Sequence, residues 1–520
     1  MYDETHRMIG RGSSSDHRVV HGDRAACASP FARAWPLLLM ASFACQVPQV
    51  DEPPPEVGDD GDEPAIVESP VDTDASAPDD AEDTSDGDSG LVVDTARTPI
   101  DVVPPPLVVT PQDVGSPTEL PGCAAVPDPA LLAPCGPGVG AWSGQMTWPS
   151  IRDALGAVGV GDRIVVCPGI HGGPLIISNG VELVAADPTG GTILEGSGTG
   201  RIVEQQRGLL TMSGFVFRHG WSVSTGGAVD SHGGTLEIAC SLFEGNRSEE
   251  MGGAVYAQGP LTIRSSVFLD NEADSGGAVG AGASLEVYDS LFLSNRANRG
   301  GGISAGPAAR LVRLTMRDNQ ALYGGGGVEG GGLRDNTIEV EDSWFISNVA
   351  GSAGGAICVD GTAASTASIA RTLFQQNSSE DGCAIKHDSG ESFSIHMIDS
   401  NFNHNTCSAG VTIAIGGDQE HRSFVSLDRA VITDATPGPA PSAFATEWAR
   451  FFGPPAPVDV VARDLVVRRN IGQAPAFLLL DADSMTCERC DFGSGADDNA
   501  PADVGKGAIV HVQAPADFAL

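Results

Sequence analysis

Short groups of hydrophobic residues recur at a nearly constant interval along the chain. From residue 210 onward, successive units each carry a large apolar residue followed three positions later by asparagine. The leading residues are Phe243, Phe268, Phe292, Met316, Phe345, Phe374 and Phe402, and the asparagines are Asn246, Asn271, Asn295, Asn319, Asn348, Asn377 and Asn405. The steps between leading residues are 25, 24, 24, 29, 29 and 28 residues. Periods of about 20 to 50 residues are typical of solenoids and other repeat arrays.

Each unit also alternates apolar and polar positions with the period of a β-strand. Apolar residues stand seven and five positions before the Phe, as Leu236 and Ile238 do before Phe243. A period of two predicts a strand with these side chains on one face. A glycine pair follows the asparagine in several units, at Gly252, Gly253, Gly276, Gly277, Gly354 and Gly355. One unit should therefore contain a strand, a bend, the Phe strand, the Asn turn and a third short strand.

These units predict an all-β fold, a single-stranded parallel β-helix. Three short strands per unit are too few for a propeller blade, which needs four longer ones. Stacked coils would pair each strand with its equivalent about 4.8 Å away, so that inward Phe, Leu and Ile columns form a continuous core. We expect asparagine to adopt the left-handed conformation of a sharp turn and to hydrogen-bond along its column. Gly-Gly suits a corner where a β-carbon would clash.

The two signatures, Phe-x-x-Asn and Gly-Gly-Ala followed by Val or Ile, resemble the repeats of chlamydial polymorphic outer-membrane proteins, a right-handed parallel β-helix family. The resemblance covers residues 215–416 and implies the right-handed form, which parallel crossovers also favour. The chain departs from the family at Cys383, which replaces a second glycine, and it lacks the strand series of a C-terminal translocator barrel. Residues 161–170 and 180–184 resemble the opening coils of pectin lyase-like proteins. Helical spacing over 150–158 predicts a cap on the end of the stack.

Charge narrows the range of partners. The chain holds 29 Lys plus Arg against 68 Asp plus Glu, for a formal net charge of −39. Nucleic-acid binding needs clustered basic residues, so this balance argues against a nucleic-acid partner. The only lysines are Lys386 and Lys506, which leaves no polybasic patch for a membrane surface.

Composition divides the chain into four segments. Residues 1–45 form an export-like segment, 46–118 an acidic Pro-rich linker, 119–160 an N-terminal cap and 161–520 the β-helix. Residues 51–101 hold 18 carboxylates and one base, so we predict a disordered, self-repelling spacer. Capture of Ca²⁺ is the alternative, but this stretch lacks the ligand spacing of calcium loops.

A candidate export signal precedes the linker. The apolar stretch Trp35–Ala44 is too short to span a bilayer, which takes about 20 residues, but it suits a signal peptide. Residues 42–45 resemble the lipobox of bacterial lipoproteins, in which the cysteine is lipidated and becomes the new N-terminus. The resemblance implies lipidation at Cys45 and a lipid anchor in the outer membrane or at the cell surface of a Gram-negative-type bacterium. A plain cleaved signal is the alternative.

The cysteines of the folded region suggest a disulfide and little else. Cys123 and Cys135, flanked by Pro and Gly, are predicted to close a loop at the start of the domain. Cys487 and Cys490 have the spacing of a zinc or redox half-site, but no second pair lies nearby to complete four zinc ligands. Cys487 falls in the inward column five residues before Phe492, which favours a small core residue. We expect no metal and no cofactor.

Residues of catalytic type are few and scattered. Paired carboxylates are the usual sign of a glycoside hydrolase. The only Asp pair of the coil region, Asp497-Asp498, lies in a loop rich in Gly and Pro. Three other groups contain reactive side chains, namely Arg218-His219, Asp230-Ser231-His232 and Lys386-His387-Asp388. Each falls near a predicted turn, where polar residues are expected anyway, so His387 and Asp388 are only weak catalytic candidates.

Two classes of function remain. The positions that the pattern places outward are small and polar, with Trp344 beside them: Ser265, Ser266, Asp289, Ser290, Asp342 and Ser343. Such a face favours a non-catalytic surface protein for adhesion or display, with a cell-surface glycan or protein as its partner. The alternative is a polysaccharide-active lyase or glycoside hydrolase, which would need a cleft of acids and aromatic residues on successive coils.

Overall fold

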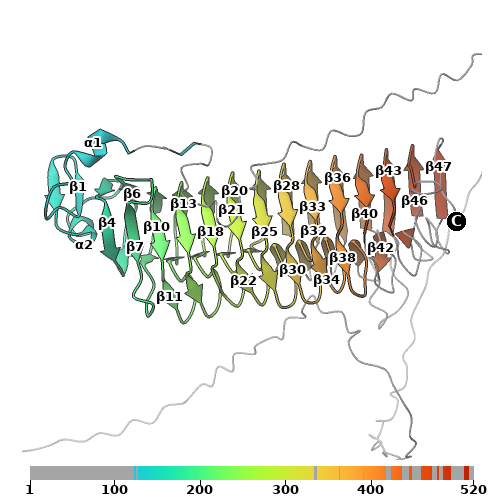
Figure 1. Cartoon of the computed structure of the whole chain (residues 1–520), viewed down its shortest axis with the longest axis horizontal. Coiled ribbons are helices and arrows are strands. Elements are labelled where there is room, and N and C mark those ends of the chain that lie inside the picture. Colours follow the sequence, from blue (N-terminus) through green and yellow to red (C-terminus); the bar gives the residue numbers. More distant parts are fainter. Residues whose placement is uncertain are drawn as a thin grey trace, which may run out of the picture. The chain divides into compact units, whose positions relative to one another are not determined.

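The computed structural model is a parallel β-helix in which successive coils stack along one axis (Figure 1). It describes residues 122–123, 127–332, 336–361, 364–389, 392–416, 423–435, 444–447, 458–470, 477–478, 484–492 and 509–513. The fold class predicted from the repeats is confirmed. The predicted export segment 1–45, with Cys45, and the predicted linker 46–118 lie outside the described residues, as do Asp497 and Asp498.

Sheet A has 16 strands and runs the length of the stack. In spatial order they are β2 (Met146–Trp148), β1 (Ala141–Ser143), β3 (Arg163–Val166), β6 (Val181–Ala185), β9 (Leu209–Ser213), β13 (Thr235–Ala239), β17 (Leu261–Arg264), β20 (Leu285–Tyr288), β24 (Ala308–Val312), β28 (Asn336–Glu341), β32 (Ser365–Ala370), β36 (Phe393–Ile398), β40 (Ser423–Asp428), β43 (Val458–Arg463), β46 (Ser484–Glu488) and β47 (Ile509–Gln513). Strand β1 pairs antiparallel with β2 and β3, whereas the following neighbours pair in parallel.

Sheet B carries the Phe strands and has 12 members. They are β4 (Gly169–Gly172), β7 (Thr192–Glu195), β10 (Val216–Arg218), β14 (Leu242–Glu244), β18 (Val267–Leu269), β21 (Leu291–Leu293), β25 (Thr315–Arg317), β29 (Trp344–Ile346), β33 (Leu373–Gln375), β37 (Asn401–Asn403), β41 (Val431–Thr433) and β44 (Val466–Arg468). Their parallel register aligns the Phe positions of successive coils.

Sheet C follows the glycine pairs and also has 12 strands. They are β5 (Leu175–Ile177), β8 (Val203–Gln205), β12 (Val229–Ser231), β16 (Val255–Ala257), β19 (Val279–Ala281), β23 (Ile303–Ala305), β27 (Val328–Gly332), β31 (Ile357–Gly361), β35 (Ile385–Ser389), β39 (Ile413–Gly416), β42 (Phe444–Glu447) and β45 (Phe477–Leu478). Two-residue strands add small ladders that the sequence pattern did not predict, and all of them except β11 directly follow an asparagine. These are β11 (Trp221–Ser222), β15 (Arg247–Ser248), β22 (Arg296–Ala297), β26 (Gln320–Ala321), β30 (Val349–Ala350), β34 (Ser378–Ser379) and β38 (Thr406–Cys407).

The phenylalanines form one stacked column in the core. Phe243, Phe268, Phe292, Phe345, Phe374 and Phe402 are each 0% exposed. Adjacent rings are nearly parallel, with centroids 4.8 Å apart between Phe243 and Phe268 and 4.7 Å apart between Phe268 and Phe292. This spacing is that of parallel strands, so the backbone repeat itself sets the ring contacts. Met316 interrupts the column between Phe292 and Phe345 and is equally buried.

The asparagines form a second buried column, which is hydrogen-bonded along the stack. In Asn295, Nδ2 donates to the Phe268 carbonyl oxygen and to Asn319 Oδ1, both at 3.0 Å. Its Oδ1 accepts from the backbone N and from Nδ2 of Asn271, both at 3.0 Å. Each side chain thereby satisfies backbone groups at the turn and a neighbouring asparagine.

The expectation that asparagine itself takes the left-handed conformation is wrong. The residue before each asparagine has the positive φ, for example Asp270 (54°), Ser294 (56°) and Asp318 (57°). Asparagine has a different role because its side chain must point inward, where it satisfies turn backbone groups that water cannot reach.

The two glycines of each pair are required for different reasons. Gly252 has φ of 66°, a left-handed conformation that glycine adopts without a steric penalty. A β-carbon on Gly253 would lie 2.1 Å from the Gly277 carbonyl oxygen and 2.5 Å from that of Glu272. The second glycine therefore lets the backbones of adjacent coils approach closely.

A serine column lies at the bend between sheets A and B. Ser266 Oγ donates to the Arg264 carbonyl oxygen (2.8 Å) and accepts from the backbone N of Ser241 (3.3 Å). The expectation that Ser266, Ser290 and Ser343 face outward is wrong, because each is 0% exposed. Their hydroxyls are needed inside, where they bond the backbone of the bend.

The N-terminal end of the stack is closed by a short cap. Helix α2 (Ile151–Leu155) buries Ile151 and Ala154 against the first strands, and the Ser150 hydroxyl accepts from the backbone N of Asp153 (3.2 Å). Helix α1 (Pro129–Leu132) precedes it, with Asp128 as its N-cap. Within the described part of the chain, no helix has the length and hydropathy needed to cross a membrane.

The disulfides differ from the predicted pairing. The described bonds are Cys123–Cys240, Cys135–Cys167, Cys383–Cys407 and Cys487–Cys490. Cys123 and Cys135 are not bonded to each other, because Cys123 lies beside Cys240 at a bend of the stack and Cys135 lies beside Cys167, directly after β3. Cys487 is 1% exposed in the core, as expected, but it is also half of a disulfide. That bond leaves no thiolate for zinc.

Candidate functional site

The weak catalytic candidate His387 lies in the core. Strand β35 turns its ring toward Phe393, with ring centroids 4.8 Å apart, and Nε2 is 2.9 Å from Ser365 Oγ. Burial, reinforced by the charge of Lys386, lowers the pKa of His387 to about 3. The imidazole is neutral at physiological pH and 0% exposed, so it is unsuited to acid or base catalysis on an external substrate.

The neighbours of His387 do not complete a site. Lys386 Nζ lies 2.8 Å from Asp381 Oδ2, and both side chains are nearly buried. Asp381 Oδ1 also accepts from the backbone N of Gly382 (2.8 Å), so this ion pair holds the loop that precedes β35. The other weak candidate, Asp388, belongs to the same strand, but its side chain lies outside the described part of the structure.

Asp230 and His232, which the sequence also singled out, meet charged groups from a neighbouring coil. Asp230 Oδ2 lies 2.6 Å from Arg201 Nη1 and 3.4 Å from His232 Nε2. It also accepts from Thr225 Oγ1 at 3.0 Å. Glu204 is the strand partner of Asp230 in β8, and its Oε2 lies 3.5 Å from the same Arg201 nitrogen. We call these five residues the Asp230 cluster.

The arginine is held as firmly as the carboxylate. Arg201 Nη2 donates to Ser222 Oγ (3.1 Å), Ser224 Oγ (3.2 Å) and the Thr225 carbonyl oxygen (3.1 Å). Its other terminal nitrogen contacts both carboxylates of the cluster. The guanidinium thus ties two coils and the following loop together.

Burial dominates the electrostatics of the cluster. Asp230 is 0% exposed, and its Oδ1 has no hydrogen-bond partner. Burial raises the pKa of Asp230 above its ordinary value, against the opposing pull of Arg201. Burial, followed by the charge of Asp230, also raises the pKa of Tyr256 on the next coil. Perturbed groups of this kind occur both in functional sites and in structural ion pairs.

The cluster offers binding groups more readily than a catalytic pair. Two carboxylates on adjacent coils are the right ingredients for glycoside chemistry. Asp230, however, has no exposed surface, whereas the side chains of Glu204 and His232 are 30% and 49% exposed. The groups that a ligand could touch are therefore Glu204 and His232, with Asp230 and Arg201 as their support.

Sequence reasoning missed Arg201, Glu204 and Thr225, although one signal was available. In sheet C, the register places Glu204, Asp230 and Tyr256 beside one another on successive coils, and each of them follows a valine. That alignment predicts neighbours on successive coils. Arg201 and Thr225 lie in loops outside it.

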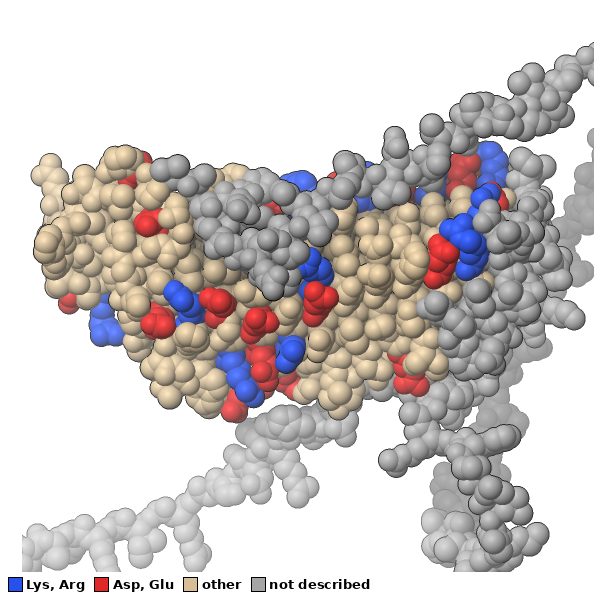
Figure 2. Space-filling view, viewed as in Figure 1, with Lys and Arg blue, Asp and Glu red and all other residues tan. Residues whose placement is uncertain are grey.

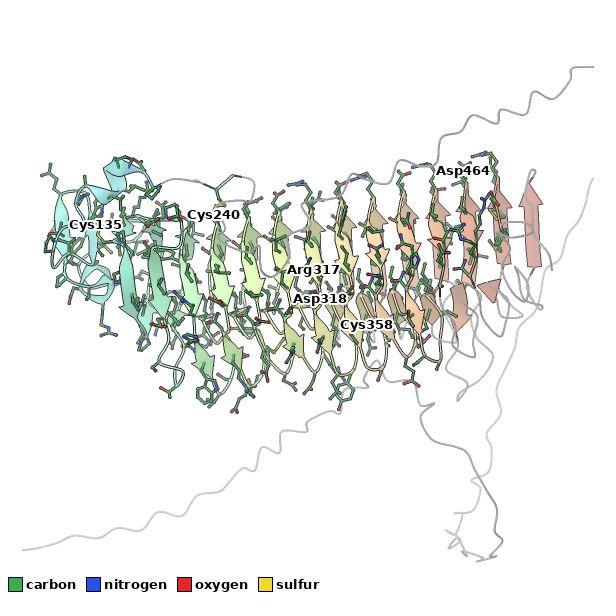
Figure 3. All side chains as sticks on the ribbon, in the orientation of Figure 1. Cys135, Cys240, Arg317, Asp318, Cys358 and Asp464 are labelled. Atoms are coloured by element: carbon green, nitrogen blue, oxygen red, sulfur yellow. A yellow bond between two sulfur atoms is a disulfide. The ribbon has the colours of Figure 1, made fainter. Side chains whose placement is uncertain are left out.

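A second set of charges forms a ladder along the bend between sheets A and B. Its members occupy the left-handed position of successive coils: Asp289, Arg313, Asp342, Arg371, Asp399, Arg429, Asp464 and Arg489. Figure 3 labels Asp464 near its C-terminal end. Acids and bases alternate without interruption, and we call this set the Asp/Arg ladder.

Each arginine of the ladder holds the aspartate of the preceding coil with two hydrogen bonds. Arg371 Nε and Nη2 donate to the two carboxylate oxygens of Asp342 at 2.6 and 3.0 Å. The same contact from Arg429 lowers the pKa of Asp399. Bidentate pairs of this kind give geometric specificity to coil stacking.

The remaining candidates do not gather into a site. His219 makes one exposed contact, with Nδ1 3.2 Å from Glu195 Oε1. Among the described residues, no group of three or more His, Cys, Asp or Glu side chains is arranged to hold a metal ion.

Comparisons with known proteins yield one structural likeness. No protein-family model matches the chain. No curated protein matches it either. Among solved structures, the catalytic unit of a thermostable GH87 α-1,3-glucanase from Streptomyces thermodiastaticus strain HF3-3 is similar, with 13% sequence identity and a TM-score of 0.34. The match covers 76% of this chain and 70% of the glucanase chain.

Proposed function

We propose that this protein is a non-catalytic, surface-displayed β-helix that presents its coil faces to a cell-surface glycan or protein. The observation that supports this most is the Asp/Arg ladder, in which prominent charged side chains bind one another between coils. Figure 2 shows the same tendency on the visible face, where acidic and basic side chains lie next to one another. Side chains committed to stacking are not available as free acids, bases or nucleophiles.

The proposal includes export and a lipid anchor. The signal-like stretch Trp35–Ala44 and the lipobox resemblance at Cys45 support an anchored protein at the outer membrane or cell surface. The acidic run 51–101 would then act as the tether between the membrane and the stack.

An assay on polysaccharides tests the non-catalytic assignment. The purified chain should release no new reducing ends or unsaturated products from a panel of neutral and acidic polysaccharides, with and without Ca²⁺. A binding assay on immobilised glycans and cell-surface proteins should instead give a saturable signal. Turnover of any polysaccharide would move the protein to the enzyme class.

The alternative function, a polysaccharide-active enzyme, is favoured by one observation, the Asp230 cluster. Two carboxylates there lie on adjacent coils beside an exposed histidine. Any turnover should then disappear in Glu204→Gln and His232→Ala. The matched control is Asp342→Asn, which removes an ion-paired carboxylate of the Asp/Arg ladder. Equal loss in the control would indicate damage to the stack instead of a catalytic site.

A further inference from the structure

The outer face of sheet B carries a stripe of apolar side chains. The middle residue of each strand points into the core, so its two neighbours point outward. We define the outer stripe as Val216, Leu242, Val267, Leu291 and Leu293, which lie on the register-paired strands β10, β14, β18 and β21. They form a hydrophobic cluster separate from the core.

These outward side chains are almost completely buried. Val267 and Leu293 are each 1% exposed, and Val216 is 5% exposed. Parallel neighbours about 4.8 Å away shield only the flanks of such a side chain, so values this low require other atoms above the sheet. Trp344 and Leu373 are the first residues of β29 and β33, in line with the first residues of the stripe strands. They are 6% and 8% exposed.

The end of the same column provides an internal comparison. Val431 and Val466 occupy the equivalent outward position in β41 and β44, and both are only half-buried. Stacking between coils therefore does not by itself exclude water from this position. At Val216 part of the cover is the loop around Gly190, where a β-carbon would lie 4.0 Å from Val216 Cγ2. From β14 to β33 the first-position side chains are also covered, and in β41 and β44 they are not.

The chain at Gly122 and Cys123 lies at the edge of this stripe. The Cys123–Cys240 disulfide holds Cys123 against Cys240, which stands two residues before Leu242 in the sequence. A β-carbon on Gly122 would lie 4.0 Å from Ser265 Oγ, one coil farther along and two residues before Val267. Gly122 and Cys123 thus place the start of the described chain at the edge of the stripe, between Leu242 and Val267.

We propose that residues 102–114 lie as an extended strap over the outer stripe. This segment reads Val-Val-Pro-Pro-Pro-Leu-Val-Val-Thr-Pro-Gln-Asp-Val, and it follows Asp101, where the acidic run ends. Three consecutive prolines hold an extended conformation without internal hydrogen bonds, which reduces the entropy lost on docking. The strap shortens the predicted free linker to residues 46–101.

The lengths agree with this arrangement. Residues 102–109, with a rise of about 3.1 Å per residue, extend about 25 Å. Five strand spacings separate Leu242 from Leu373, which amounts to about 24 Å. The intervening residues 115–121 are enough to return the chain to Cys123 at the edge of the sheet.

Site-specific photocrosslinking tests the strap in the full-length chain with its disulfides intact. A benzophenone amino acid replaces Leu107, and a matched control carries it at Ala77 in the acidic run. Irradiation should link position 107 to peptides of the same chain that contain Leu242, Val267 or Leu291, and position 77 to none of them. Absence of those links, or links formed mainly between two copies of the chain, would overturn the proposal.

A second measurement does not depend on crosslinking. The double variant Leu107→Asp/Val108→Asp should release the strap and raise the fluorescence of the apolar dye ANS severalfold. The control Ile66→Asp/Val67→Asp changes equally apolar residues inside the acidic run and should leave the signal unchanged. Equal signals from the two variants would mean that residues 102–114 do not cover the stripe.

Discussion

At Asn295, one side chain makes hydrogen bonds to two coils at once. Replacement by alanine would leave the backbone N of Asn271 and the carbonyl oxygen of Phe268 without these partners. An unpaired buried group costs about 1 to 3 kcal/mol. Asn295→Ala should therefore lower the free energy of unfolding by that amount or more, measured by urea titration. Asn298→Ala, three residues away on the surface, should change it little, and an equal loss there would contradict a special role for the column.

The buried imidazole of His387 predicts a pH dependence of stability. Its pKa is about 3 in the folded protein against an ordinary value of 6.5, so the unfolded chain binds a proton first as pH falls. Stability should decline from about pH 6.5 toward pH 3, with this residue contributing up to about 1.4 kcal/mol per pH unit.

The variant His387→Leu isolates this contribution. Its unfolding free energy should fall less steeply between pH 6.5 and pH 4.5 than that of the parent protein. His219→Leu, which changes an exposed histidine, should keep the parent slope. A parental slope in His387→Leu would show that the imidazole does not stay neutral in the fold.

Several residue-level details could not be predicted from the repeat alone. Periodicity shows that a serine recurs before the Phe strand, but the chain bends there and the alternation of faces breaks. Ser266 therefore points inward although the strand pattern placed it outward. For the same reason, the left-handed residue proved to be the one before asparagine.

At the scale of elements, the Phe column makes each strand of sheet B depend on its neighbours. Phe292 is 0% exposed and stacks on Phe268. Phe292→Ala should cost about 3 to 5 kcal/mol, as other buried Phe truncations do. The loss should be local, because each coil of a solenoid contacts only its neighbours.

Thermal unfolding with hydrogen exchange across β18, β21 and β25 measures this loss. Leu322→Ala, at a residue that is 57% exposed, serves as the control. Unchanged unfolding of Phe292→Ala would argue against the column as a source of stability.

The strands were predictable because every coil repeats the same local pattern, so errors at one position are corrected by the others. The disulfides were not predictable in this way. Cys123 and Cys240 are 117 residues apart, and only the path of the chain around the cap brings them together. Arg201 was not predictable either, because it contacts Asp230 from a loop that carries no repeat signature.

At the scale of the whole molecule, the proposed lipid anchor gives a direct prediction. Cys45→Ser removes the only thiol in the lipobox-like segment, so the exported protein should move from the membrane fraction to the soluble fraction. Cell fractionation with immunoblotting measures the change. Cys27→Ser is the matched control and should remain with the membrane, and retention of Cys45→Ser would exclude lipidation at this residue.

The Cys123–Cys240 bond also decides where mechanical tension would act. A pull on the chain upstream of Cys123 passes through the sulfur atoms directly to the coil of β13 and β14. The cap and the first coils, which lie within the 117-residue covalent loop, carry none of that force. After reduction of this bond, tension would pass through the cap and the first coils. The residues between Cys123 and Cys240 could then unfold and extend. An anchored protein under flow would then extend before its distal coils felt any load.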